Sequence, residues 1–248
     1  SSQVWDLNVD LHEKFQPSWN DLVSLFGVRG YVNPVASKEL LKKVTHFTKA
    51  KLREKISKAK PEVVLLSVFS SQSIDFVIHL TNIIRQLLPD TYIILGGRGL
   101  DNIDRATQTT IGNLYIQHLP VDCVYIGDAE NNLINVLTNR YQGVFESPPV
   151  NSTDLDNCPL PSWIGYEFEK YQAIKVPVTG SKGCVKKCTF CDVENSWPNY
   201  VYRKGANIAK EIIKSYQEIG VNEFEFTDNL INGSIKNFRE MNKVLAEE

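Results

Sequence analysis

The chain lacks long hydrophobic runs and an excess of either charge. Its longest apolar stretches, residues 63–68 and 92–95, are far shorter than the about 18 residues that a membrane-spanning helix needs. Lys and Arg number 27 against 29 Asp and Glu, a net charge of -2, so we expect no nucleic-acid or acidic-membrane partner. The first residues, Ser-Ser-Gln-Val-Trp-Asp, have neither a basic region nor an apolar stretch, so we expect no signal peptide. These absences favour a soluble protein.

The first 150 residues alternate between apolar runs and helical patterns. Strands buried on both faces are expected at residues 62–67, 91–95 and 122–126, and a fourth strand at 4–9. Apolar residues at helical spacing predict helices at 40–57 and 74–88. This alternation predicts an α/β fold with an open, doubly wound parallel sheet.

Short polar or glycine-rich loops follow three of the expected strands. These loops are residues 70–73, 96–99 and 127–130. Ligands of doubly wound sheets bind beyond the carboxyl ends of the strands, where glycines let the backbone approach a ligand and hydroxyl groups can bond a phosphate or a sugar. The three loops are therefore a candidate ligand-binding edge.

Cysteine is scarce but unevenly placed. The chain has five cysteines, an odd number, and Cys184, Cys188 and Cys191 lie in one short segment led by Gly183. This arrangement does not resemble a secreted disulfide framework. The segment also carries two lysines, which indicates an exposed loop rather than a buried core. The spacing therefore predicts a metal site with Cys184, Cys188 and Cys191 as ligands.

The number of thiols in this loop bears on the metal. A structural zinc site needs four ligands, usually as two separated pairs. Here the nearest other cysteine, Cys158, lies 26 residues upstream, and the last histidine is His118. Three thiolates can instead hold three irons of a [4Fe–4S] cluster and leave the fourth iron open. Lys186 and Lys187 would offset part of the negative charge of such a cluster.

The residues around the cysteines alternate between strand and helix patterns. Strands are expected at 173–179 and 223–227. Helices are expected at 207–219, closed by Gly220, and at 234–246. Strand, loop, helix, strand, loop, helix is the start of a parallel (β/α) barrel, in which chemistry occurs on the loops after the strands.

The Gly-Cys-x3-Cys-x2-Cys segment, with Phe190 before the third cysteine, resembles the radical S-adenosylmethionine (radical SAM) enzymes. The resemblance implies a [4Fe–4S] cluster on the three cysteines and reductive cleavage of SAM, with electrons from a flavodoxin or ferredoxin. It places Phe190 near the adenine of SAM. It also gives Asp228 and Asn229, in a stretch similar to a family motif after the second strand, a role in holding SAM; a helix cap or loop turn is the alternative.

The three loops of the first sheet resemble the cobalamin-binding domain that precedes many radical SAM barrels. The resemblance implies cobalamin contacts from Ser70, Ser71, Gly96, Gly97 and Gly127. The chain has no Asp-x-His-x-x-Gly motif, so the lower face of a bound cobalamin is expected to lack a protein histidine. Such enzymes include methyltransferases that act on unactivated carbons, and this is the activity we expect here.

The expected domains are a cobalamin-binding-like domain at 1–150, a linker at 151–171 and the N-terminal part of a radical SAM barrel at 172–248. A full barrel needs about 200 residues, so we expect an incomplete chain or one completed by a partner. Reduced thiols and an oxygen-sensitive cluster imply the cytoplasm. The substrate, a small molecule or a peptide, is not identified by the sequence.

Two other functions stay open. One is a radical SAM enzyme whose first domain binds no cobalamin, including the methylthiotransferases; these need three more cysteines, and only Cys123 and Cys158 lie outside the loop. The other is a non-enzymatic module in which a zinc ion or an iron–sulfur cluster only braces the fold.

Overall fold

The computed structural model describes residues 3–26, 34–68, 74–100, 110–171, 173–191 and 193–248. The chain divides into two compact units. One unit is Leu7–Pro148, and the other is Pro149–Glu248 together with the first residues of the chain up to Asp6. The residues expected to form a linker, 151–171, belong to this second unit.

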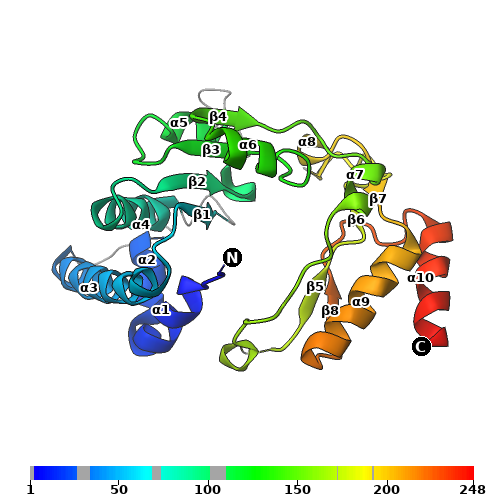
Figure 1. Cartoon of the computed structure of the whole chain (residues 1–248), viewed down its shortest axis with the longest axis horizontal. Helices are drawn as coiled ribbons and strands as arrows, with labels where there is room; N and C mark the ends of the chain where they lie inside the picture. Colours follow the sequence, from blue (N-terminus) through cyan, green and yellow to red (C-terminus); the bar gives the residue numbers. More distant parts are fainter. Residues whose placement is uncertain (1–2, 27–33, 69–73, 101–109, 172, 192) are drawn as a thin grey trace. The chain divides into compact units, whose positions relative to one another are not determined.

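The Leu7–Pro148 unit is a mixed α/β structure built on one sheet (Figure 1). Its elements are α1 (Leu7–Phe15), η1 (Gln16–Ser18), α2 (Trp19–Phe26), α3 (Pro34–Ala59), β1 (Val63–Ser67), α4 (Ile74–Leu87), β2 (Tyr92–Gly96), η3 (Arg98–Leu100), α5 (Ile111–Tyr115), β3 (Cys123–Ile126), α6 (Leu133–Asn139) and β4 (Gly143–Glu146). The four strands are parallel, in the order β1-β2-β3-β4. The parallel α/β sheet expected from the sequence is therefore confirmed.

Helices cover both faces of this sheet because side chains alternate along each strand. Leu95 of β2 lies opposite Val124 of β3, and both pack in a core cluster that α4 completes. The preceding pair, Ile94 and Cys123, points to the other face and packs with α6. Helices on both faces of a parallel sheet are typical of Rossmann-like folds.

Two expectations for this unit are wrong. Residues 4–9 form no strand, since α1 begins at Leu7; Leu7 and Leu11, four residues apart, are buried on one helical face. The fourth strand is β4 instead. β1 is not buried on both faces either: Leu65 is 53% exposed, because β1 is the first strand in the sheet order and has only β2 beside it.

The described residues of the second unit form two separate two-stranded sheets together with several helices. Its elements are α7 (Ser152–Asn157), η4 (Phe168–Lys170), β5 (Val176–Val178), β6 (Ser181–Lys182), α8 (Val193–Ser196), β7 (Val201–Tyr202), α9 (Gly205–Ile219), β8 (Phe224–Phe226) and α10 (Ile235–Glu247). The expected strands and helices at 173–179, 207–219, 223–227 and 234–246 correspond to β5, α9, β8 and α10.

β5 and β8 are adjacent and parallel, with Val178 opposite Phe226. α9 connects them in sequence and ends at Gly220 in the left-handed conformation, as the sequence predicted. Val178, Ile208 of α9 and Met241 of α10 share one buried cluster, and Figure 1 shows the two helices side by side. Antiparallel β6 and β7 form a second, smaller pair.

The buried thiol of Cys123 gives a pH-dependent prediction for the first unit. Burial raises the pKa of this thiol to about 11; a hydrogen bond with Tyr92 lowers it and the charge of Asp122 raises it further. The unfolded thiol ionises near its ordinary pKa of 9.0. Above about pH 9 ionisation therefore favours the unfolded state, and the folded state loses stability as the pH rises toward 11. Below about pH 9 this contribution to stability is fully present.

We therefore expect the free energy of unfolding of the wild type, measured relative to that of Cys123→Ala, to fall by about 2 kcal/mol between pH 8 and pH 10.5. Urea unfolding of both proteins at the two pH values measures it. The difference between the two proteins cancels contributions from tyrosines elsewhere in the chain. An unchanged difference would contradict the assignment of a raised pKa to Cys123.

Candidate functional site

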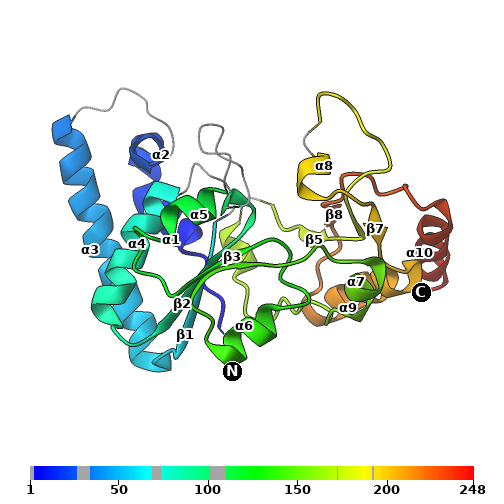
Figure 2. The same cartoon turned by 90° about the horizontal axis from the view of Figure 1, so that it is seen from above.

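The three clustered cysteines lie on a loop between β6 and β7. β6 pairs antiparallel with β7, Ser181 opposite Tyr202, so the chain leaves and returns at one place. Residues 183–200 between these strands, which we call the cysteine loop, include the short helix α8. Figure 2 shows this segment in yellow, extending beside α8 and β7. Cys184 is half-buried, whereas Cys188 and Cys191 are exposed.

Gly183 begins the loop in a conformation that requires glycine. Its φ is +78°, and a Cβ atom there would lie 2.5 Å from the backbone oxygen of Asn199 at the other end of the loop. Further along, the backbone N–H of Cys191 donates to the carbonyl of Cys188 at 3.0 Å, and that of Lys186 donates to the Cys184 sulfur at 3.3 Å. Local turns therefore order the segment that carries the thiols.

The donor chemistry of this loop fits an iron–sulfur cluster. All five cysteines of the chain are described, and none is in a disulfide. Three thiols within one accessible segment are suitable ligands for Fe–S clusters. Among the described residues no three His, Cys, Asp or Glu side chains are gathered closely enough to hold a metal ion. The ligand set of Cys184, Cys188 and Cys191 therefore stays a prediction.

Two other residues of the loop differ in their surroundings. Phe190, expected near the adenine of SAM, is 92% exposed beside Cys191. Lys187, expected to offset cluster charge, donates from its Nζ to an Oε1 of Glu194 at 2.6 Å. Since that pair is exposed to solvent on both sides, Lys187 can still exchange Glu194 for another anion at small cost.

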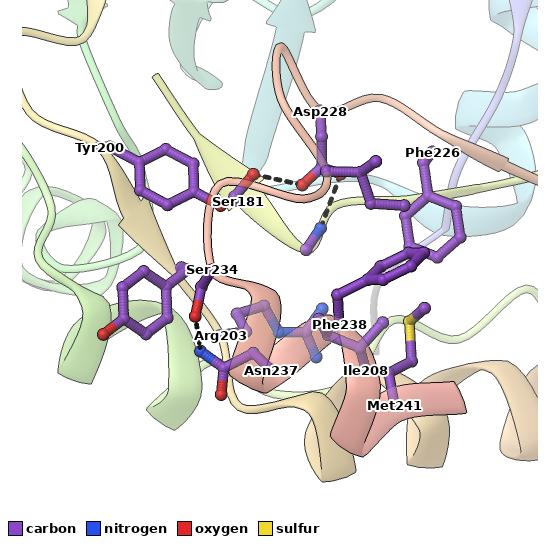
Figure 3. A pocket seen from close by; sticks show the side chains of 13 residues that line it. Ser181, Tyr200, Arg203, Ile208, Phe226, Asp228, Ser234, Asn237, Phe238 and Met241 are labelled. Carbon is purple, nitrogen blue, oxygen red and sulfur yellow. Dashed lines mark hydrogen bonds between the residues drawn. The ribbon is translucent and has the colours of Figure 1, made fainter. Parts of the chain in front are cut away.

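Asp228 links the loop after β8 to the residues that lead into the cysteine loop. One carboxylate oxygen accepts the backbone N–H of Gly180 at 3.0 Å, and the other accepts the hydroxyl of the buried Ser181. Figure 3 shows both bonds as dashed lines. Asn229, the next residue, is exposed. Asp228 thus braces two segments that are far apart in the sequence, which is neither the helix cap nor the loop turn given as its alternative. The SAM contacts of Asp228 and Asn229 stay predictions.

Arg203 is a functional candidate that the sequence reasoning missed. It follows β7 and donates from Nη1 to the Thr179 carbonyl at 3.0 Å and to Oε2 of Glu211 at 2.5 Å. Its backbone N–H also donates to the Gly180 carbonyl at 2.8 Å. The Arg203 and Glu211 side chains are only 11% and 3% exposed. The sequence did contain a signal for this ion pair. Glu211 lies on the face of α9 that also carries Ile208, and a charged side chain among apolar residues needs a partner of opposite charge.

A small pocket lies where these groups meet, between the carboxyl ends of β5 and β8 and the first turn of α10 (Figure 3). Ser181, Tyr200, Arg203, Asp228, Asn237 and Phe238 are among its lining residues. Tyr200 donates its hydroxyl to the Leu230 carbonyl at 3.3 Å. The polar groups that line the pocket thus bond mainly to other parts of the chain.

The structure describes three of the five residues expected to contact cobalamin. Ser70 and Ser71 lie outside the described residues. Gly96 ends β2 opposite Ser67. Gly97 has a φ of +110°, and a Cβ atom there would lie 2.5 Å from the Val68 carbonyl oxygen; at Gly127, after β3, the nearest atom would be the Ser147 carbonyl oxygen at 3.0 Å.

Gly97 and Gly127 are therefore required by the packing of the chain on itself. A Cβ atom at Gly97 or Gly127 would meet backbone rather than a cradle left open for a ligand. The described residues at this edge of the sheet do not by themselves call for a corrinoid.

Comparison with known proteins gives one informative similarity. No family model matches the chain. The chain is 24% identical over 239 residues to the cytidylyl-2-hydroxyethylphosphonate methyltransferase of Streptomyces wedmorensis. The match covers 75% of this chain and 43% of that protein, so the chain spans less than half the length of this relative. In the described part of the chain, no helix combines the length and apolar character needed to cross a membrane.

Proposed function

We propose that this chain belongs to a radical SAM methyltransferase and that Cys184, Cys188 and Cys191 hold its [4Fe–4S] cluster. The observation that carries the proposal is three thiols on one accessible loop, none of them in a disulfide. The loop follows β5, a strand with the parallel neighbour β8, and is reached from β5 through the short strand β6. The similarity to a methyltransferase supports the reaction class. β5, α9, β8 and α10 would be the first two strand–helix units of a (β/α) barrel.

The residues of the chain have distinct tasks in this proposal. The three thiolates hold three irons and leave one iron without a protein ligand. The cluster, when bound, supplies the electron for reductive cleavage of SAM. Thr179 and Thr227, whose hydroxyls lie 2.8 Å apart after β5 and β8, present polar groups at the strand ends where barrel enzymes bind substrates. The exposed amide of Asn229 is available to polar groups of SAM.

The methyl acceptor and the methyl carrier are proposed from the family resemblance and not from the geometry of the site. We propose methyl transfer to an unactivated carbon, electron supply from a flavodoxin or ferredoxin, and a cytoplasmic location. Cobalamin is the carrier that the resemblance implies, and the carboxyl edge of the β1–β4 sheet is where it would bind. The phosphonate in the name of the relative suggests an organic small molecule as substrate.

Anaerobic reconstitution with iron and sulfide tests the proposal on the 248-residue chain. We expect about four irons and four sulfides per chain, a change in the electron paramagnetic resonance (EPR) spectrum of the reduced cluster when SAM is added, and retention of added hydroxocobalamin through gel filtration. Zinc binding with no cluster and no effect of SAM would instead support the non-enzymatic module. A cluster without corrinoid would favour the radical SAM enzyme that lacks cobalamin.

A further inference from the structure

We propose that Asp228 and Arg203 are positioning residues that fix the base of the cysteine loop, and that Asp228 acts in this way rather than as a ligand of SAM. We call these two residues the loop clamp. The inference rests on the proposed function, because it assigns the means by which the chain positions the cluster ligands.

The Asp228 half of the clamp acts on the strand that enters the loop. The backbone N–H of Gly180 donates to one carboxylate oxygen of Asp228 at 3.0 Å. The hydroxyl of Ser181 donates to the other oxygen. Ser181 is 3% exposed and lies three residues before Cys184. Hydrogen bonds to a carboxylate are stronger than those between neutral groups. Asp228 therefore fixes both the backbone and a side chain immediately before the first cysteine.

The Arg203 half of the clamp acts on the strand that leaves the loop. Its backbone N–H bonds to the Gly180 carbonyl and its guanidinium to the Thr179 carbonyl, so the exit is tied to the entry. Glu211 of α9 neutralises and orients the guanidinium. The two halves meet at Gly180, whose N–H is held by Asp228 and whose carbonyl is held by Arg203.

This arrangement matters because the loop has little packing of its own. Cys188 and Cys191 are exposed, as are Val185 and Phe190 at 53% and 92%. Ligands on such a segment are positioned mainly through its anchored ends. Removing a group that hydrogen-bonds a metal ligand changes metal affinity about 10–100-fold, and for a support of the backbone before Cys184 we expect the low end of that range. The clamp anchors the residues just before Cys184, next to the Lys182–Val201 strand pair.

Three variants test the inference. Asp228→Ala removes both acceptors. Asp228→Asn keeps an oxygen for the Gly180 N–H and an amide that can bond the Ser181 oxygen, but it has no charge. Asp156→Ala is the matched control: this carboxylate, 11% exposed, accepts the backbone N–H of Lys204 at 2.8 Å and the Asn207 amide at 2.9 Å without touching the entry to the loop.

The measurements are the rate at which a chelator removes iron from the reconstituted cluster, the EPR spectrum of the reduced cluster with and without SAM, and thermal unfolding. We expect iron loss about tenfold faster in Asp228→Ala, with an altered EPR spectrum already in the absence of SAM. Asp228→Asn should restore the wild-type rate and spectrum, and Asp156→Ala should lower the unfolding temperature without changing either.

Other outcomes overturn the inference in recognisable ways. A wild-type cluster in Asp228→Ala together with loss of the SAM effect in Asp228→Asn would make Asp228 a ligand of SAM. Equal rates of iron loss in Asp228→Ala and Asp156→Ala would show that Asp228 contributes to general stability and has no specific effect on the cluster. Absence of a cluster in the wild type would instead defeat the proposed function itself, and the clamp with it.

Discussion

Replacing Cys184, Cys188 or Cys191 by alanine is expected to abolish the broad iron–sulfur absorption of the reconstituted chain in each case. A [4Fe–4S] cluster with one open iron needs a thiolate on each of the other three irons. The loop contains these three cysteines and no other cysteine or histidine that could replace one of them. The visible absorption spectrum and iron analysis after anaerobic reconstitution measure the effect.

Cys158→Ala is the control for this series. Cys158 is half-buried at the end of α7, and its thiol donates to the Asp154 carbonyl at 3.3 Å, an ordinary structural contact. Its replacement should leave absorption and iron content unchanged. A cluster that survives in any of the three loop variants, or one lost in Cys158→Ala, would overturn the ligand assignment.

Arg203→Ala is expected to destabilise the unit that contains the cysteine loop by about 3–5 kcal/mol, because it leaves the Glu211 carboxylate buried without its cation. Glu211 is 3% exposed and accepts from Arg203 at 2.5 Å. The variant also removes a donor from the Thr179 carbonyl. Urea unfolding of the full chain, followed by a probe in the Pro149–Glu248 unit such as Trp163 or Trp197 fluorescence, measures the loss.

The neighbouring Lys204→Ala is the matched control. Lys204 is 72% exposed and its Nζ lies 3.6 Å from Oδ2 of Asp156, so its loss should cost less than about 1 kcal/mol. The double variant Arg203→Met, Glu211→Leu should be less destabilised than Arg203→Ala, since it buries no unpaired charge. Equal costs for Arg203→Ala and Lys204→Ala would contradict the role of this buried pair.

Local patterns in the sequence predicted most elements that have a clear period or a long apolar run. α9 with its stop at Gly220, β8 with its alternating residues, and the three strands β1, β2 and β3 all follow from interactions within a few residues. Residues 4–9 show the limit of this approach. As a further apolar run they indicate a strand, but the Leu7–Leu11 spacing and the burial of both side chains give α1 instead.

The sequence by itself determined where the candidate chemistry lies, because the spacing of Cys184, Cys188 and Cys191 is local and survives any arrangement of the rest of the chain. Only the tertiary structure decided how that loop is held. Asp228 meets Gly180 across 48 residues, and Arg203 reaches Thr179 across 24. Such pairs leave no periodic signal in the sequence. The Asp228–Gly180 pair exists only once β5 and β8 lie side by side, and Arg203 reaches Thr179 only once β6 and β7 pair.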